Sequence, residues 1–297
     1  MRYFTSSSQK WEISNIIFLD TLPIDTIKIN LSFLQLKTLP NLDHLLNLEL
    51  IDVSHNGLYE LPNFEKLIKL NTICCDNNYL KYLPDFNNLI NLENIIVYKN
   101  YLTSMPEWNN LINLKYINCT FNKITYLPEW NNLTKLENIS CFNNELTSLP
   151  NWTNLINLIN IYCGSNKLEY LPEWDSLSNL NILHCYDNNL LSLPKWEKLI
   201  NLTCLECQNN KLTYLPEFNN LINLEVINVS NNNLLTLPSS FIQLNNLKKI
   251  YYNDNPNLYI PINLLRYLNK SYNIYNDNQN VHNSYIQQSL KKNIIRK

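Results

Sequence analysis

The sequence predicts an α/β solenoid, a right-handed arc with a parallel β-sheet on its concave face and short 3₁₀ or irregular segments on its convex face. Two observations carry this prediction. Apolar residues two positions apart recur in every period, and a proline returns every 22 residues. A fixed period of this length indicates stacked supersecondary units. The prolines are Pro40, Pro62, Pro84, Pro106, Pro128, Pro150, Pro172, Pro194, Pro216 and Pro238.

Each period begins with a short strand. In the copy that reads LENISCFNNELTSLPNWTNLIN, Ile139 and Cys141 lie two apart, so they share one face of the strand. Ser140 and Phe142 point the other way. One strand cannot bury its apolar face alone, but coils stacked about 4.8 Å apart build a parallel sheet with a continuous interior.

An asparagine follows each strand, and we expect it to turn the chain and to satisfy backbone groups that no neighbouring strand reaches. We interpret this column as a structural ladder: Asn56, Asn78, Asn100, Asn122, Asn144, Asn166, Asn188, Asn210, Asn232 and Asn255.

After each Leu-Pro pair an aromatic residue and two leucines follow at spacings of three, as in Trp108, Leu111 and Leu114. Proline fixes φ for a tight turn or a first helical residue, and a spacing of three fits a short 3₁₀-like segment. The aromatic residues are expected to pack as a second ladder on the convex side rather than to serve as a ligand platform.

The pattern L-x-x-I-x-C/V-x-x-N-x-L resembles the signature L-x-x-L-x-L-x-x-N/C-x-L of the leucine-rich repeat family. The resemblance covers residues 26–261, about 11 repeats of the short 22-residue class. It implies a protein that interacts with other proteins, although a fold does not name the partner.

The two ends depart from the repeat. Residues 1–25 are expected to form an N-terminal cap, because a terminal coil would otherwise expose its apolar edge. Residues 262–297 are expected to form a C-terminal cap and a polar tail. The tail contains three apolar residues spaced four positions apart, which give one weak amphipathic face: Ile286, Leu290 and Ile294. A cap helix, a partner-binding tail and the remnant of a larger domain remain open alternatives.

Six cysteines hold one repeat position that valine fills in other copies: Cys75, Cys119, Cys141, Cys163, Cys185 and Cys207. Because free cysteine behaves as a small hydrophobe, we interpret this column as core packing, not as disulfides or a zinc site. Cys74 and Cys204 fall at outward-facing positions and are the thiols expected to be able to react.

Composition argues against several classes of function. Two glycines cannot build a phosphate-binding loop, and the four histidines form no spaced metal pair. The net charge of -2 argues against a nucleic-acid binder, and no stretch has the apolar length of a membrane span. We therefore expect a monomeric cytoplasmic protein that is not an enzyme and has no cofactor, metal or catalytic residues. The Asn-rich, Lys-rich and Ile-rich composition further suggests a large DNA virus or a protist as the source.

The outward strand positions tile the concave face, and exposed aromatics among small polar side chains are typical anchors of protein interfaces. We predict that a protein or peptide partner binds there to Tyr98, Tyr116, Phe121, Phe142, Tyr162, His184 and Tyr186. Gly164 lies within this patch, where it either opens a notch for a ligand group or has no role. The alternatives are an adaptor that works through its C-terminal tail and a targeting protein of the ubiquitin-ligase kind.

Overall fold

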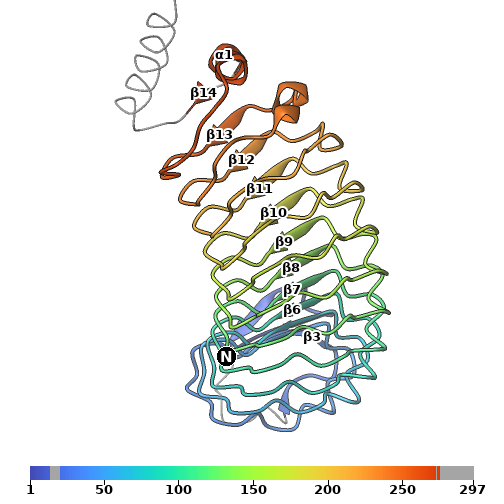
Figure 1. Cartoon of the computed structure of the whole chain (residues 1–297). Helices are drawn as coiled ribbons and strands as arrows, with labels where there is room; N and C mark the ends of the chain where they lie inside the picture. The colour runs from blue at the N-terminus through green and yellow to red at the C-terminus, as the bar shows by residue number, and fades with distance from the viewer. Residues whose placement is uncertain (14–20, 272, 275–297) are drawn as a thin grey trace, which may run out of the picture.

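A computed structural model describes residues 1–13, 21–271 and 273–274, which form a curved stack of coils with one continuous 14-stranded sheet. Figure 1 shows the strands of successive coils rising one above another along one side of the stack. The elements are β1 (Arg2–Thr5), β2 (Trp11–Ile13), β3 (Thr26–Asn30), β4 (Leu50–Asp52), β5 (Thr72–Cys74), β6 (Asn94–Ile96), β7 (Tyr116–Asn118), β8 (Asn138–Ser140), β9 (Asn160–Tyr162), β10 (Ile182–His184), β11 (Cys204–Glu206), β12 (Val226–Asn228), the 3₁₀ helix η2 (Ser239–Gln243), β13 (Lys249–Tyr251), α1 (Ile262–Ser271) and β14 (Asn273–Ile274).

The strands from β3 to β14 pair in parallel, and from β3 to β12 each residue faces the residue 22 positions further along the chain. Ile139 of β8, for example, lies opposite Ile161 of β9, and both are fully buried. The 22-residue period of the sequence therefore equals the offset between paired residues of neighbouring strands. The predicted solenoid with a parallel sheet is confirmed, with little helix among the described residues.

The asparagine column satisfies the backbone at the end of each strand. Asn144 donates from Nδ2 to the carbonyl oxygens of Cys119 and Cys141, at 3.0 Å each, and its Oδ1 accepts from the backbone N–H of Ile124 at 3.0 Å. One side chain thus joins two adjacent coils, because its own coil and the preceding one both supply partners. The predicted structural ladder is confirmed.

The tryptophans stack behind the sheet. Neighbouring indole rings from Trp108 to Trp196 have centroids 6.1–6.4 Å apart and lie within 9° of parallel. Each is buried, and Trp130 Nε1 donates to the carbonyl oxygen of Pro106 at 2.9 Å. The predicted packing role of this ladder is confirmed.

The segments after the tryptophans are consecutive turns rather than regular 3₁₀ helix. Leu133 N–H donates to Trp130 O and Leu136 N–H to Leu133 O, but Trp130 has a positive φ of 47°. A bulky residue adopts that conformation only when its surroundings hold it there, and the indole stack does so. Of the described coils, η2 alone is assigned as a 3₁₀ helix.

The thiol column lies in the interior. The side chains of Cys75, Cys119, Cys141, Cys163, Cys185 and Cys207 are 0% exposed. They sit beside the buried isoleucines and leucines of the strands, where other coils place valine. Their interpretation as core packing is confirmed.

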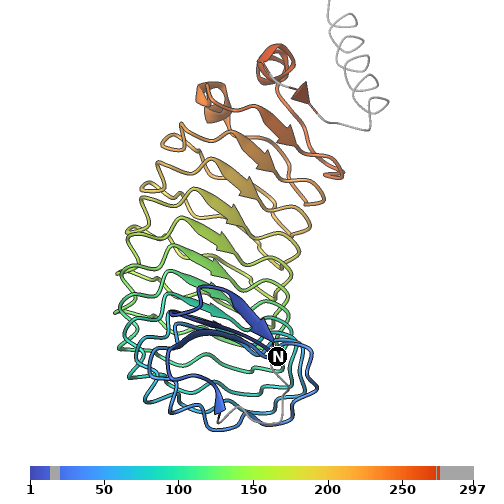
Figure 2. The same ribbon diagram turned by 180° about the vertical axis from the view of Figure 1, so that it is seen from behind.

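Different elements cover the two ends of the stack. At the start, β1 pairs antiparallel with both β2 and β3, and Figure 2 shows this N-terminal strand beside the first coils. Leu34 occupies the place of the ladder asparagine in the first coil, and Asn56 of the next coil accepts its N–H at 3.1 Å. At the other end, α1 lies next to η2 and buries Leu264 and Leu268 against the last coil.

The predicted amphipathic face at Ile286, Leu290 and Ile294 falls outside the described residues. Among residues 1–13, 21–271 and 273–274, no helical segment has the length and hydrophobicity that a membrane span requires.

Candidate functional site

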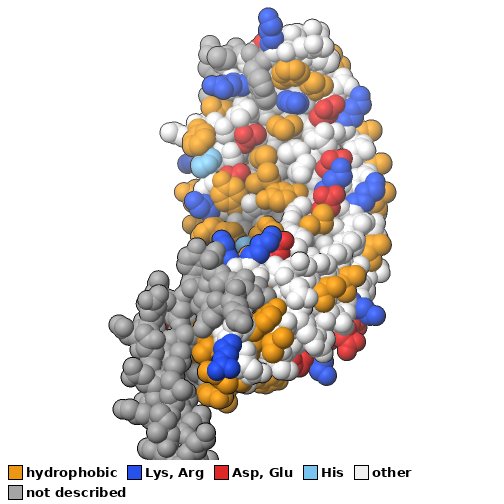
Figure 3. Space-filling model, turned by 90° about the horizontal axis from the view of Figure 1, so that it is seen from above, with side chains coloured by type: hydrophobic (Ala, Val, Ile, Leu, Met, Phe, Trp, Pro, Cys, Tyr) orange, Lys and Arg blue, Asp and Glu red, His pale blue; other side chains and the backbone are white. Residues whose placement is uncertain are grey.

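The seven aromatic residues predicted to bind a partner all lie on the outward side of β6 to β10 or in the turns that follow these strands. Tyr116, Tyr162 and His184 are strand residues, and all three are half-buried. Tyr98, Phe142 and Tyr186 come two residues after their strands and are half-buried too, whereas Phe121 sits in a turn and is 41% exposed. Hydrophobic, acidic and basic side chains are interspersed on the face seen in Figure 3, without one continuous charged area.

Two of these residues form a phenylalanine pair. The rings of Phe121 and Phe142 meet edge to face, with centroids 5.2 Å apart and an interplanar angle of 74°. The ammonium group of Lys99 lies 5.9 Å from the centre of the Phe121 ring. The pair therefore offers both an apolar surface and a cation above it.

Three others form a second cluster, which contains Tyr162, His184 and Tyr186. The His184 ring lies 5.1 Å from the Tyr162 ring at an interplanar angle of 80°, and 6.2 Å from the Tyr186 ring. The Tyr186 ring fills the space above Gly164. The expectation that Gly164 opens a notch for a ligand group is therefore wrong, because the space it leaves is occupied by this side chain.

The remaining two residues, Tyr98 and Tyr116, make none of these ring contacts, although Tyr116 lies near enough to Tyr162 to affect its pKa. Burial, and secondly the charge of Asp76, raise the pKa of Tyr98. Burial, and secondly Tyr116, raise the pKa of Tyr162. Both hydroxyl groups are therefore neutral near pH 7, and that of Tyr98 is engaged with the side chain of Asp76.

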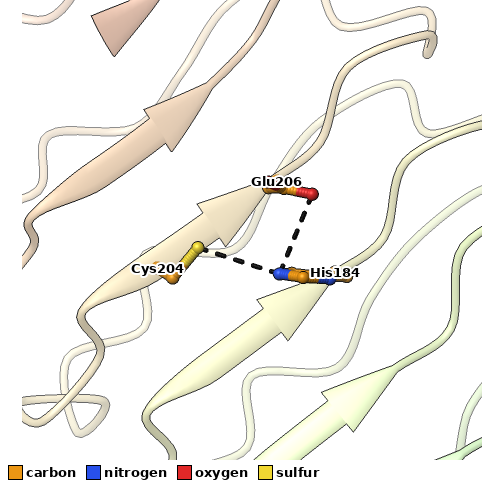
Figure 4. A group of neighbouring side chains, drawn as sticks. All are labelled: His184, Cys204 and Glu206. Carbon is orange, nitrogen blue, oxygen red and sulfur yellow. Dashed lines mark hydrogen bonds and ion pairs between the residues drawn. The ribbon is translucent and has the colours of Figure 1, made fainter. Parts of the chain in front are cut away.

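Sequence reasoning missed a group of three polar side chains beside the second aromatic cluster. His184 Nε2 lies 3.8 Å from Cys204 Sγ and 3.8 Å from Glu206 Oε2 (Figure 4). The spacing of the histidines along the chain gives no sign of it. The signal is the register: His184 faces Glu206 across the sheet, and Cys204 lies two residues before Glu206 on the same face of β11.

The protonation of this group follows from its half-buried position. Burial lowers the pKa of His184, while Glu206 acts in the opposite direction, so the imidazole is neutral near pH 7 and the contact with Glu206 is not an ion pair there. Burial and Glu206 raise the pKa of Cys204 to about 11. The thiol is therefore protonated near neutral pH.

The other outward-facing cysteine is protonated as well. Burial, and secondly the charges of Asp52 and Asp76, raise the pKa of Cys74 to about 12. Because the thiolate is the reactive form, neither Cys74 nor Cys204 is activated as a nucleophile. Cys74 and Cys204 are the two cysteines that are not fully buried, as their outward-facing positions predict, and neither has a neighbouring group that lowers its pKa.

The first coils carry a different, acidic part of the concave face. His55 stacks on Phe33 at a centroid distance of 4.1 Å, and its Nε2 lies 3.9 Å from Asp76 Oδ2. Asp52 accepts hydrogen bonds from Asn30 Nδ2 at 2.8 Å and from Ser54 Oγ at 2.6 Å. These carboxylates are held by neighbours in the sheet, and the acidic part meets the aromatic part at Tyr98, which interacts with Asp76.

A shallow, open depression of about 530 Å³ lies where the chain enters β7 to β10. Its walls are polar, with two lysines, one glutamate and three asparagines around Ile159. The lining residues are Lys115, Lys135, Glu137, Asn157, Ile159, Asn179 and Asn181. It contains none of the seven predicted contact residues.

No protein-family model and no curated protein matches the chain. Among solved structures, the chain is similar to YopM, a leucine-rich effector protein from Yersinia pestis, with 32% identity over 82% of this chain and 66% of that one, at a TM-score of 0.66. A leucine-rich repeat protein of Leptospira interrogans, 23% identical over 88% of this chain and 98% of that one at a TM-score of 0.57, shares the fold.

A plant peptide hormone receptor, RGFR1 in complex with RGF2, is 25% identical over 86% of this chain and 48% of that one, at a TM-score of 0.72. The chain thus spans about half the length of this receptor structure. The fold is the leucine-rich repeat fold.

Proposed function

We propose that this chain, which has the leucine-rich repeat fold, is a non-enzymatic binding module that holds a protein or peptide partner on the concave face of its sheet. The contact surface consists of the Phe121–Phe142 pair and the cluster of Tyr162, His184 and Tyr186, flanked by Tyr98 and Tyr116. The Asn and Ser side chains around these rings supply hydrogen-bonding groups at the edge of the surface.

The two ring clusters support this proposal most directly. Five aromatic side chains stand on the outward side of β7 to β10 or just after these strands. Phe121 and Phe142 pack as one pair, and the other three pack as the second cluster. Rings fixed in this way lose little side-chain entropy when a partner binds, and tyrosine combines a large apolar area with a hydroxyl group. Such residues are typical energetic centres of protein interfaces.

Three similar structures add support of a general kind. RGFR1 is in complex with RGF2. The similar structure of PEPR1 with AtPEP1 is 25% identical to this chain, over 80% of the length of this chain. YopM is an effector protein. By this analogy we expect the partner here to be a protein or peptide, but its identity does not follow from the similarity.

The test compares partner capture by two double variants. Tyr162→Ala/Tyr186→Ala removes the rings on either side of His184. Tyr126→Ala/Tyr170→Ala removes two tyrosines that lie outside the strands and are 56% and 57% exposed. Affinity capture with the wild-type chain from its native cell identifies the partner by mass spectrometry, and its affinity for each purified variant is then measured.

We expect the first variant to lose at least about tenfold in affinity, which corresponds to about 1.4 kcal/mol, and the second to bind like the wild type. Both variants should keep the thermal unfolding midpoint close to that of the wild type. Unchanged affinity in Tyr162→Ala/Tyr186→Ala would contradict the concave-face proposal. Loss of capture on deletion of residues 272–297 alone would instead place the partner on the tail.

We infer a monomer in the cytoplasm, without nucleic-acid or membrane binding, from charge and composition. The source, a large DNA virus or a protist, is inferred from the Asn-rich composition in the same way. Size-exclusion chromatography with light scattering tests the monomeric state, and localisation of a tagged chain tests the cytoplasmic location.

A further inference from the structure

Three potential metal ligands converge on the outward face of β10 and β11. They are the imidazole of His184, the thiol of Cys204 and the carboxylate of Glu206, and their ligand atoms all lie within 4.8 Å of one another. Figure 4 shows the Cys204 and Glu206 side chains directed toward the His184 ring from the neighbouring strand. Among residues 1–13, 21–271 and 273–274, no other group of three His, Cys, Asp or Glu side chains meets this distance.

We propose that His184, Cys204 and Glu206 bind one Zn²⁺ ion on the concave face. The site shares His184 with the cluster of Tyr162, His184 and Tyr186 that belongs to the proposed contact surface, but zinc binding is measured on the isolated chain and does not depend on a partner. A nitrogen, a sulfur and an oxygen ligand together form a donor set that zinc accepts, and thiolate disfavours the hard cations Mg²⁺ and Ca²⁺.

The distances fit a tetrahedral ion after a small closure. Bonds of about 2.0–2.3 Å to zinc place the ligand atoms of a tetrahedron about 3.4–3.6 Å apart. The His184 Nε2–Cys204 Sγ and His184 Nε2–Glu206 Oε2 distances are both 3.8 Å. Cys204 Sγ and the Glu206 carboxylate oxygen lie within 4.8 Å of each other, so closing all three atoms to tetrahedral spacing takes side-chain shifts of up to about 1 Å, which half-buried side chains on the face of the sheet allow.

The fold fixes the three ligands on rigid elements. His184 and Glu206 are directly opposed in the parallel ladder, and Cys204 stands two residues from Glu206 on the same face. The rings of Tyr162 and Tyr186 pack against the imidazole and restrict its rotation. A site that is built on strands and braced by neighbours loses little entropy when the ion binds.

The charges of the site balance those of the ion. On binding, the Cys204 thiol releases its proton to the solvent and the sulfur bonds to zinc as a thiolate. The imidazole binds as a neutral ligand and Glu206 as a carboxylate, so two negative charges meet Zn²⁺. Three protein ligands leave the fourth tetrahedral position to a water molecule on the concave side.

The test uses the purified full-length chain, freed of metal by a chelator that is then removed. We expect one equivalent of Zn²⁺ to bind in isothermal titration calorimetry. Substituting Co²⁺ should produce the absorption of a tetrahedral ion together with a thiolate-to-cobalt charge-transfer band. Circular dichroism before and after chelation checks that the fold is retained.

The decisive variant is Cys204→Ser, and its matched control is Cys74→Ser. Cys74 is also half-buried on the outward face, but its charged neighbours are Asp52 and Asp76 and it has no histidine against it. Cys204→Ser should weaken Zn²⁺ binding by more than about 100-fold, beyond the loss expected for an outer-shell group, and Cys74→Ser should bind like the wild type. His184→Asn gives an independent reading if Cys204→Ser does not fold.

The proposal is overturned by any of three results. These are no Zn²⁺ uptake by the folded chain, uptake that is unchanged in both Cys204→Ser and His184→Asn, and an equal loss in Cys74→Ser. In each of these cases the three side chains form a polar contact between neighbouring coils and nothing more.

Discussion

The ring of Tyr186 lies so close over Gly164 that a Cβ atom on Gly164 would stand 2.8 Å from its Cε2 and Cζ atoms. The two residues occupy the same place in successive coils, two positions after β9 and β10. Gly164 has a negative φ, so it is required here by space and not by backbone conformation. The absence of a side chain at Gly164 therefore makes room for the Tyr186 ring of the second cluster.

Gly164→Ala is expected to push the Tyr186 ring toward solvent. The free energy of unfolding should fall by about 1 kcal/mol, the low end of the overpacking range, because the half-buried ring can swing away. Urea denaturation measures the loss. In the Tyr186→Ala background the same substitution should cost nothing, since the clash is gone, and a cost that persists there would show that another contact is responsible.

Asn144→Ala is expected to lower the free energy of unfolding by about 1–3 kcal/mol, the cost of one unsatisfied buried group. It leaves the buried N–H of Ile124 without its partner, and it removes one of two asparagine donors from the carbonyl oxygens of Cys119 and Cys141, which keep Asn122 and Asn166. The control is Asn131→Ala, at an exposed asparagine, which should change stability by less than about 0.5 kcal/mol. Similar losses in both variants would contradict the ladder's structural role.

Trp152→Ala is expected to cost about 3–5 kcal/mol, because it opens a cavity between two stacked indoles and removes the hydrogen bond from Nε1 to Pro128 O at 3.1 Å. Trp152→Phe should cost only about 1–2 kcal/mol, since other coils place Phe64, Phe86 and Phe218 in this column. Chemical denaturation measures both values. A phenylalanine variant as unstable as the alanine variant would mean that the indole hydrogen bond dominates.

Glu217 is expected to make the last coils sensitive to acid. Its carboxylate accepts hydrogen bonds from the backbone N–H groups of Ser239, at 3.3 Å, and Ser240, at 2.7 Å, where η2 begins. Burial by itself raises the pKa of Glu217, but the hydrogen bonds from Ser240 and Ser239 outweigh it, so the pKa is lowered. A lowered pKa in the folded state contributes stability that is present above the unfolded value and is lost as the pH falls through the folded value.

Glu217→Gln should therefore be less stable than the wild type at pH 7, and the difference should shrink as the pH falls below about 4. Thermal unfolding between pH 3 and pH 7 measures it. Lys195→Gln, at the corresponding position of another coil, is the control and should show no such convergence. A constant difference across this range would contradict the role of the charge.

Much of the fold is predictable because the 22-residue repeat length sets which residues become neighbours in adjacent coils. The 22-residue spacing of the prolines assigns each residue to a column, and the columns of Ile139, Cys141, Asn144 and Trp152 then take the burial expected for them. A parallel, in-register sheet makes this possible, since residues one period apart become neighbours. The antiparallel pairing of β1 with β3 is not predictable in this way, because residues 1–25 do not share the repeat.

The candidate site is less predictable, because it depends on contacts between columns. His184 and Cys204 are 20 residues apart, so a search at the repeat spacing passes over them, and only the diagonal relation across β10 and β11 reveals the contact. Gly164 was expected either to open a notch for a ligand group or to have no role, and the length of the Tyr186 side chain, which fills the space above it, decides between them. The thiol pKa values depend on burial and on carboxylates from neighbouring strands, which the sequence does not order in space.

The buried thiols can report how often each coil of the stack opens. Cys119, Cys141, Cys163, Cys185 and Cys207 occupy one place in five consecutive coils, and each is shielded from solvent. A thiol reagent can reach any one of them only while its own coil is open. The labelling rate at each cysteine, read by mass spectrometry, therefore reports how often that coil opens and whether the ends of the stack loosen before its middle.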